Sequence, residues 1–186
     1  GVGDFYYSPP SGFLALCSQN LDTPAIIDGT EHFNTVLYTA ASSNGTYNIT
    51  GNGFQPDWSW VKNRNDVERH LLFDSVRGNS GMTDKFLVAN ATSAEGANGV
   101  TGTTVTVNAD GMQIVESSID SGELYFNSRT YVMWNWLAAT AFSNDASATG
   151  VGTIDSEGRT NATAGFSIIK WTGTGSNGTI AHGLNA

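Results

Sequence analysis

Short runs of alternating apolar and polar residues recur along the chain, and clusters of Gly, Asn, Asp and Ser separate them. A period of two is typical of strands that bury one face, and such clusters mark tight turns. The pattern therefore predicts a series of short strands instead of long helices. The predicted strands are Phe33 to Thr39, Trp58 to Lys62, Leu71 to Val76, Phe86 to Asn90, Thr103 to Val107, Met112 to Glu116, Leu124 to Phe126, Thr130 to Leu137 and Phe166 to Thr172.

Turn dipeptides lie between several of these strands, at Asn44-Gly45, Asn98-Gly99, Asp110-Gly111 and Asn177-Gly178. Asn-Gly and Asp-Gly favour the backbone geometry of two-residue hairpins. Short strands joined by such turns predict an all-β fold, an antiparallel β-sandwich.

The tryptophans follow the same alternation. Trp58 and Trp60 share one face of their strand, and Val132, Trp134 and Trp136 share one face of theirs. Because large aromatic side chains are usually buried, we expect these rings to anchor the core. A ligand platform of lectin type is the alternative for the same rings.

Two segments have a different composition. Residues 140–164 consist mainly of Ala, Ser, Thr, Gly and Asn, which predicts a linker. At the start of the chain, an aromatic run and an apolar run lie on either side of Pro9-Pro10, which predicts two short extended pieces. The first residues show neither an initiator Met nor a secretory signal, so we expect them to lie inside a longer polypeptide.

An internal repeat links the two ends of the sequence. Phe33 to Thr46 aligns without gaps on Phe166 to Thr179, a constant offset of 133 positions from 33 to 166. The second copy would be truncated at Ala186, which predicts that the chain is a segment of a tandem array.

The charge balance limits the function. Eight Lys and Arg stand against 17 Asp and Glu, for a net charge of −9. Nucleic-acid binding needs clustered cations, so we expect no nucleic-acid partner. No run approaches the roughly 20 apolar residues of a membrane span, so no membrane insertion is expected. The single cysteine, Cys17, excludes an intramolecular disulfide.

Catalytic and metal patterns are weak. Glu116, Asp120 and Glu123 are spaced around turns, which does not place them on one strand face as a glycosidase pair requires. The three histidines lie far apart in the sequence. Several aspartates lie near turns, where sandwiches hold structural calcium, but no calcium-binding loop motif occurs. We therefore predict no catalytic residue, no metal site and no cofactor.

The most distinctive polar segment runs from Lys62 to Arg77, where four of the eight basic residues lie. Acidic residues are interleaved with them, so local ion pairs are one interpretation. The other is a polar ledge that grips an acidic or hydroxyl-rich ligand through forked hydrogen bonds and a stacking ring. Two tyrosines beside turns are expected to be exposed. The candidate ligand-binding residues are Lys62, Asn63, Arg64, Arg77, Tyr47 and Tyr125.

Four blocks carry a resemblance to a known family: Gly53 to Arg64, His70 to Gly78, Asn108 to Met112 and Tyr131 to Trp136. Together they resemble an uncharacterised repeat family of bacteriophage virion and tail-fibre proteins, notably of marine and cyanobacterial phages. Met112 and Asn135 depart from the residues that such repeats commonly carry there. The resemblance implies a concanavalin A-like or laminin-G-like jelly roll. Residues 5–17 are similar to the final strands of the SPRY-type domain that often precedes these repeats.

This resemblance, together with the repeat, implies five parts. They are residues 1–24 as the C-terminal strands of a preceding SPRY-type domain, 25–31 as a connector, 32–139 as a sandwich repeat, 140–164 as a linker and 165–186 as the start of a second, truncated repeat.

The function that follows is that of a non-enzymatic segment of a virion or tail fibre, extracellular after release, which contributes to attachment to a host-surface glycan or protein. Its expected partners are further copies of itself, other virion proteins and a host-surface glycan. The first alternative is a purely structural spacer or capsid-decoration module. The second is a glycan hydrolase.

Overall fold

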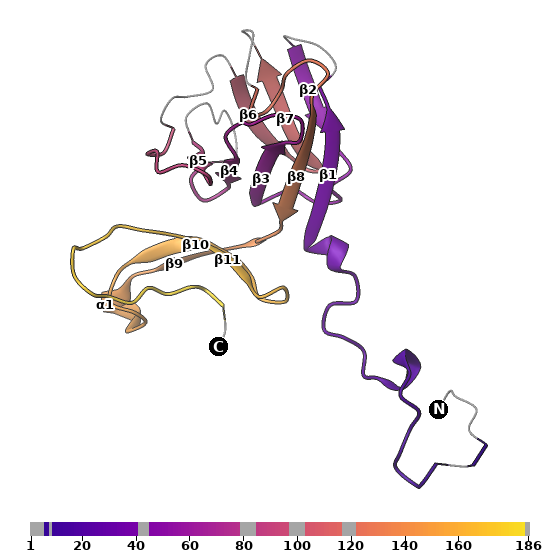
Figure 1. Ribbon diagram of the computed structural model, residues 1–186. Helices are drawn as coiled ribbons and strands as arrows, with labels where there is room; N and C mark the ends of the chain where they lie inside the picture. The colour runs from indigo at the N-terminus through magenta and orange to yellow at the C-terminus, as the bar shows by residue number, and fades with distance from the viewer. Residues whose placement is uncertain are drawn as a thin grey trace.

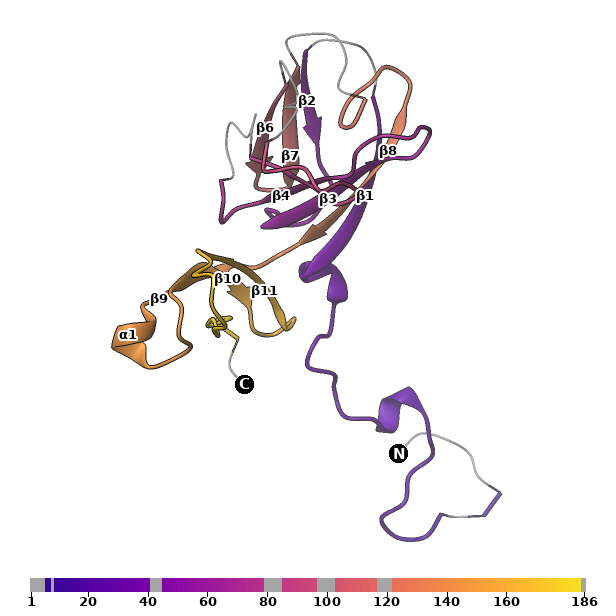
Figure 2. The same cartoon turned by 60° about the vertical axis from the view of Figure 1, so that its left-hand side comes forward.

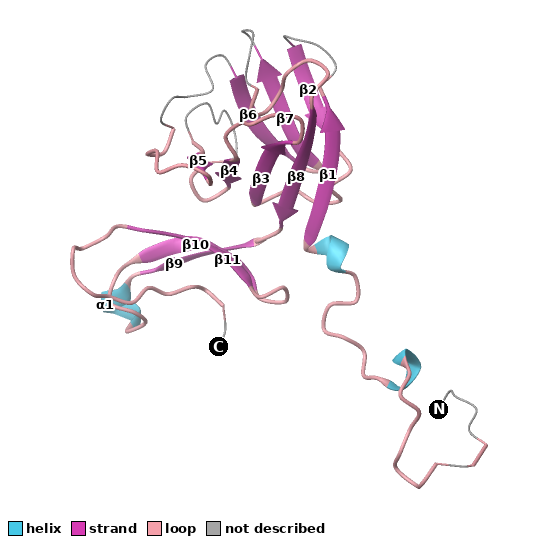
Figure 3. Ribbon diagram, viewed as in Figure 1, coloured by secondary structure: helices cyan, strands magenta, loops and turns pink. Residues whose placement is uncertain are grey.

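Strands make up nearly all the regular structure of the described residues (Figure 3). The computed structural model describes residues 6–7, 9–40, 45–78, 85–96, 103–116 and 122–184. Within them, none of the helices has the length and apolar character that a membrane crossing requires.

The larger sheet has five antiparallel strands in the order β1-β8-β3-β4-β5 (Figure 1). Its strands are β1 (Phe33–Thr39), β8 (Thr130–Trp136), β3 (Trp58–Asn63), β4 (Leu71–Asp74) and β5 (Leu87–Val88). β1 and β8, which lie far apart in the sequence, pair along their whole length from Phe33 opposite Trp136 to Thr39 opposite Thr130.

A second sheet lies against one face of the first (Figure 1). It contains β2 (Gly45–Ile49), β7 (Gly111–Glu116) and β6 (Thr103–Asn108) in that order, all antiparallel. One apolar cluster joins both sheets, and it includes Val61, Phe73 and Met133 from the larger sheet and Val105, Met112 and Ile114 from the smaller one. The predicted all-β, antiparallel sandwich is confirmed.

Eight of the nine predicted strands form, with ends that shift by a few residues. The exception is Leu124 to Phe126, a turn in which only Tyr125 makes a bridge. Three strands were not predicted: β2, β9 and β10. Their exposed residues are mostly small and polar, so they carry little of the alternation on which the prediction depends.

The predicted Asp110-Gly111 turn joins β6 to β7, with Asn108 opposite Gly111. Gly111 has a φ of +142°, and a Cβ there would lie 2.1 Å from the carbonyl oxygen of Ile49, so only glycine fits. Asp110 accepts hydrogen bonds from the backbone N–H of Gly51 at 3.0 Å and of Gly53 at 2.6 Å. This carboxylate therefore fixes the loop that follows β2. Asn98-Gly99 lies outside the described residues.

Asp110 gives a pH-dependent prediction. The bond from Gly51, followed by the one from Gly53, lowers the pKa of Asp110 below its ordinary value of 3.8. A lowered pKa stabilises the fold above the ordinary value, and this stabilisation is lost as the pH falls through the folded-state value. We expect Asp110→Asn to have a lower melting temperature than the wild type at about pH 6. The difference between the two melting temperatures should narrow at about pH 2.5. Thermal unfolding at both pH values measures it, and a constant gap would contradict it.

The expected linker at 140–164 is wrong, because these residues build most of a third sheet, β11-β10-β9. It contains β9 (Thr140–Asn144), β10 (Ser156–Asn161) and β11 (Phe166–Trp171), and the short helix α1 (Ala146–Thr149) lies between the first two. Small residues allow the close approach of its strands. A Cβ at Gly158 would lie 2.0 Å from the carbonyl oxygen of Ile168 and 2.8 Å from the Phe142 ring.

The second repeat copy forms a strand of the C-terminal sheet. Phe166–Trp171 is a strand, as its counterpart Phe33–Thr39 is. It pairs with β10 from Asn161 opposite Phe166 to Ser156 opposite Trp171. Within the described residues, this strand therefore belongs to the C-terminal sheet.

The described residues before β1 contain no strand. They form two short 3-10 turns, η1 (Ser18–Asn20) and η2 (Gly29–Glu31), in an otherwise extended segment that leads away from the sandwich (Figures 1 and 2). Phe13, Leu14 and Leu16 are exposed. In the described part of this segment, the expected extended pieces do not become strands, and they join none of the three sheets that would pair their backbone groups.

The C-terminal sheet lies at one end of the sandwich, close to the end of β8 (Figures 1 and 2). Arg159 of β10 places Nε 2.8 Å from Oδ1 of Asp57, which is 4% exposed. Asn161 contacts Nδ1 of His32 at 2.9 Å and donates to the carbonyl of Leu137 at 3.2 Å. These contacts fix one end of the sheet against the sandwich.

Candidate functional site

The outer face of the five-stranded sheet, which points away from the core, carries four of the five tryptophans. Register places Trp58 opposite Trp136 and Trp60 opposite Trp134, in adjacent cross-strand pairs. Their neighbours on β3 and β8, which include Val61 and Met133, are buried in the core. Since successive side chains of a strand point to opposite faces, the four indoles point outward.

These rings pack on one another edge to face or at a tilt. The ring centroids of Trp58 and Trp136 lie 4.5 Å apart, and those of Trp60 and Trp134 lie 5.6 Å apart. Each indole is half-buried. Such mutual contact holds the rings as a preformed aromatic surface across two central strands.

One end of this surface is covered by the C-terminal sheet. Phe166 of β11 lies 6.2 Å from Trp58 and 6.0 Å from Trp136, between ring centroids. Phe33 of β1 packs on Trp136 from the other side, at 4.6 Å. A cavity of about 570 Å³ lies at this corner, lined in part by Ile26, His32, Phe33, Trp136 and Phe166.

The expectation that the tryptophans anchor the core is therefore wrong for these four. The alternation of these residues was predicted correctly, but the face that is buried in the core was not. The buried positions of β3 are Ser59, Val61 and Asn63, and the two polar residues are bonded there. Ser59 donates to Oδ1 of Asn135 at 2.6 Å, and Asn63 donates to the carbonyl of Gly122 at 2.8 Å. These hydrogen bonds offset the cost of burying polar side chains, which leaves the indoles outside.

A basic region continues the same face beyond Trp60. Lys62 and Arg64 follow at alternate positions, and the N–H of Arg64 extends the β3–β8 ladder to the carbonyl of Thr130 at 2.8 Å. His70, just before β4, lies 6.1 Å from Trp60 between ring centroids. Burial, and then the charge of Lys62, lowers the pKa of His70, so its ring is neutral at pH 7. The tryptophan face consists of Trp58, Trp60, Lys62, Arg64, His70, Trp134 and Trp136.

Two of the predicted ligand residues instead have structural contacts. Asn63 is 1% exposed, and its Oδ1 accepts from the N–H groups of Asn65 and Asp66. Arg77 has a side chain only 12% exposed and pairs with Asp74 at 2.5 Å. At these positions, the local-contact interpretation explains the geometry.

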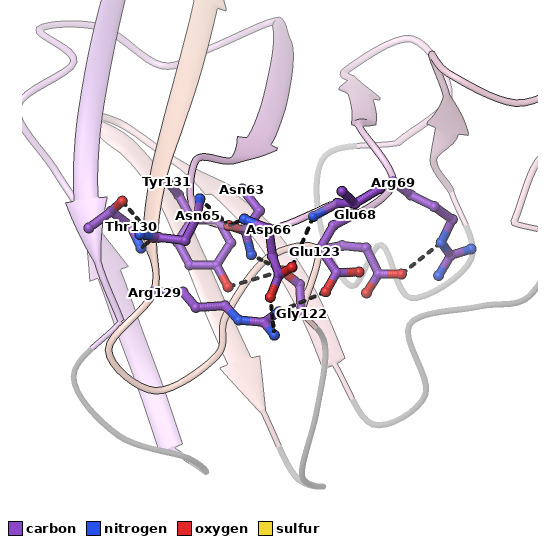
Figure 4. Close-up of polar contacts among 11 residues, drawn as sticks. Asn63, Asn65, Asp66, Glu68, Arg69, Gly122, Glu123, Arg129, Thr130 and Tyr131 are labelled. Atoms are coloured by element: carbon purple, nitrogen blue, oxygen red, sulfur yellow. Dashed lines mark hydrogen bonds and ion pairs between the residues drawn. The ribbon is translucent and has the colours of Figure 1, made fainter.

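Acidic and basic residues of the expected ledge form a network with a loop distant in sequence (Figure 4). Arg129 pairs with Asp66 at 2.8 Å and with Glu68 at 2.7 Å. Arg69 pairs with Glu123 at 2.7 Å. Arg129 was not a predicted contact, because it lies more than 50 residues from Arg77 and only the β3–β8 pairing brings it here.

The two predicted tyrosines do come together. Tyr47 and Tyr125 stack with centroids 3.6 Å apart and an interplanar angle of 21°. Tyr125 is 3% exposed, so its expected exposure is wrong, whereas Tyr47 is half-buried. A groove of about 510 Å³, lined in part by Val36, Tyr38, Ile49 and both rings, runs beside edge strands β1 and β2. These rings therefore lie in a different place from Lys62 and Arg64.

The described side chains do not converge as metal ligands: no group of three or more His, Cys, Asp or Glu among them could hold an ion. Glu116 is 4% exposed and accepts from Thr103 at 3.2 Å. Asp57 lies nearest to serine, backbone and arginine donors instead of other carboxylates.

The fold and this surface define a class: an antiparallel β-sandwich with an aromatic and basic patch on the outer face of one sheet. Residues 28–186 match the model of DUF7483, a domain of unknown function, and the chain belongs to this family. The matched range begins just before η2 and includes the sandwich and the C-terminal sheet. No curated protein and no solved structure shows significant similarity to the chain.

Proposed function

We propose that this protein is a non-enzymatic segment of a bacteriophage virion appendage, such as a tail fibre, that attaches to a glycan or protein of the host surface. The tryptophan face is the proposed contact surface. The observation that carries this proposal is the outward position of Trp58, Trp60, Trp134 and Trp136.

The outward position of the four indoles costs free energy, because it leaves apolar area in water. Antiparallel sheets with one buried face normally turn polar side chains to water on the other. Here Leu37 of β1 and Leu87 of β5 extend the apolar surface outward, with 60% and 39% exposure. Exposed apolar side chains that gather on one face mark interaction sites, and indoles stack well on sugar rings and on other side chains.

The virion setting rests on the resemblance of four sequence blocks to phage repeats. Single contacts with one strand face would be weak, and copies repeated along a fibre would supply avidity. In this proposal the protein acts as a homo-oligomer beside other virion proteins, and it is extracellular after release.

The test replaces two rings of the face. Trp60→Ala with Trp134→Ala is expected to weaken binding of the oligomeric protein to an array of bacterial surface glycans and envelope proteins by about 30-fold, because aromatic anchors dominate such contacts. Trp171→Ala is the matched control, since Trp171 lies on β11 and is 52% exposed.

Binding that is unchanged in the double variant would overturn the proposed contact surface. Near-ultraviolet circular dichroism and urea unfolding check that both variants remain folded. These measurements separate a lost contact from a lost fold.

A structural spacer or capsid-decoration module is the second candidate. One observation favours it: Phe166 of the same chain already covers Trp58 and Trp136, so this face accepts protein contacts. In that case the double variant would change the sedimentation coefficient of the assembly and would leave array binding unaffected.

A glycan hydrolase receives no support from Glu116 and Glu123, the two of its three candidate carboxylates that lie in the described residues. Glu116 is buried beside Thr103, and Glu123 pairs with Arg69. Neither is placed as a carboxylate facing an open cleft. Asp120 lies outside the described residues.

A further inference from the structure

The charge pattern of the tryptophan face points to a class of ligand. Six of the eight basic side chains lie within 4.0 Å of a carboxylate: Arg69, Arg77, Lys85, Arg129, Arg159 and Lys170. The other two are Lys62 and Arg64, and neither has a carboxylate of the described residues within that distance. Both lie on this face, in a chain with 17 acidic residues.

Each of these two cations keeps donors for a ligand. Nζ of Lys62 donates to the carbonyl of Asn63 at 2.7 Å, which leaves two of its three donors available. Arg64 is exposed, and its backbone N–H makes the contact with β8 while its guanidinium enters none of the ion pairs. An arginine fork matches the two oxygens of a carboxylate.

Among the described residues, Asp74, opposite Trp58, is the only acidic residue that the strand register places on the outer face. Its charge is matched by Arg77 at 2.5 Å. The tryptophan face therefore keeps two cations without a carboxylate partner in the described residues, Lys62 and Arg64, although the whole chain carries a net charge of −9. These two cations attract a ligand anion.

Spacing connects the rings to the cations. Alternate residues of a strand lie about 7 Å apart, so Lys62 is one such step from Trp60 and Arg64 is two. A sugar stacked on Trp60 can present an exocyclic carboxylate to the flexible Lys62 side chain, and the next unit of the chain can reach Arg64. His70, neutral at pH 7, adds a hydrogen-bonding group beside Trp60.

We propose that the ligand of the tryptophan face is an acidic polysaccharide whose sugars carry carboxylates. The proposal rests on the proposed function, because it names the ligand class of the same surface. A nucleic acid offers both stacking bases and anions, but it needs a track of cations along its backbone. Lys62 and Arg64 are two cations in a chain of net charge −9 and do not form such a track, so a carboxylated polysaccharide is favoured over a nucleic acid.

The experiment measures binding of the full chain to polygalacturonate and to the same polymer after its carboxyl groups are reduced to alcohols. Titration calorimetry or biolayer interferometry serves for both. We expect the acidic polymer to bind about ten-fold tighter and its affinity to fall as salt is raised. Lys62→Gln with Arg64→Gln should remove that difference and leave the neutral polymer unaffected.

The matched control is Lys85→Gln with Lys170→Gln, which removes the same charge from two cations paired with Glu95 and Glu157. This control should bind polygalacturonate as the wild type does. Equal loss in both double variants would mean that only net charge matters, and it would overturn the proposal. Tighter binding of a single-stranded oligonucleotide than of polygalacturonate would also overturn it.

The outcomes also separate this inference from the proposed function. If both polymers bind equally and Trp60→Ala with Trp134→Ala abolishes both, the attachment face stands and its acidic specificity is wrong. If the tryptophan variant binds polygalacturonate as the wild type does, the face itself is wrong. If the protein binds neither polymer, the inferred ligand class is wrong, whereas array binding that depends on Trp60 and Trp134 would still support the face.

Discussion

Replacing Phe73 with alanine is expected to lower the free energy of unfolding by about 3–5 kcal/mol, the range for deleting a buried aromatic ring. Phe73 is 1% exposed and lies 6.3 Å from Phe86 between ring centroids, in the cluster that joins both sheets. Trp60→Ala removes a larger ring from an adjacent strand but leaves no enclosed cavity. We expect it to cost about 1–2 kcal/mol, because part of its area is already in water.

Urea unfolding followed by far-ultraviolet circular dichroism measures both variants under the same conditions. Phe73→Leu, which keeps most of the apolar volume, serves as the control and should fall between Phe73→Ala and the wild type. A Trp60→Ala variant as unstable as Phe73→Ala would place the indole in the core and contradict the outward tryptophan face.

The second large effect concerns Asp57. Its carboxylate accepts from Oγ of Ser75 at 2.7 Å and from the N–H of Ala138 at 2.8 Å, and it lies 2.8 Å from Nε of Arg159. Asp57→Ala leaves the buried N–H of Ala138 without its acceptor and the Arg159 guanidinium without its paired carboxylate, so we expect a loss of about 3–5 kcal/mol. Arg159→Ala leaves the two hydrogen bonds intact and should cost about 1–3 kcal/mol.

A double-mutant cycle over Asp57 and Arg159 isolates their coupling. Hydrogen exchange adds a spatial measure: in Arg159→Ala the amides of β10 should exchange faster, whereas those of β3 stay protected. Lys170→Ala is the control. It breaks an ion pair with Glu157 in which both side chains are about half exposed, and such exposed pairs contribute little to stability. A cycle with no coupling energy would show that Arg159 does not hold the C-terminal sheet through Asp57.

The strands of the sandwich were predictable because their signal is local. β1 forms at its predicted residues, and the hairpin at Asp110-Gly111 follows from its turn chemistry. The strands that escaped prediction, such as β10 with Gly158 at its centre, contain small and polar residues. Their stability comes from backbone pairing to both neighbours, a relation between distant segments that composition does not report.

The candidate site was only partly predictable. Lys62 and Arg64 were named from the clustering of cations, and they lie on the proposed contact surface. Asn63 and Arg77 come from the same polar segment, yet they make structural contacts: Asn63 accepts a hydrogen bond in the turn after β3, and Arg77 pairs with Asp74 at the end of β4. The fold decides which of these residues find structural partners and which stay on the surface. In the same way, Arg129 contacts Glu68 only because β8 lies beside β3.

By itself, the sequence determined an all-β protein of short antiparallel strands, and it determined that Trp58 and Trp60 share one strand face. Period and turn chemistry are properties of neighbouring residues, so they can be read along the chain. Only the tertiary structure decided which face is buried. The smaller sheet packs over Val61 and Met133, and Ser59 finds Asn135 there, so the indoles were left to point outward.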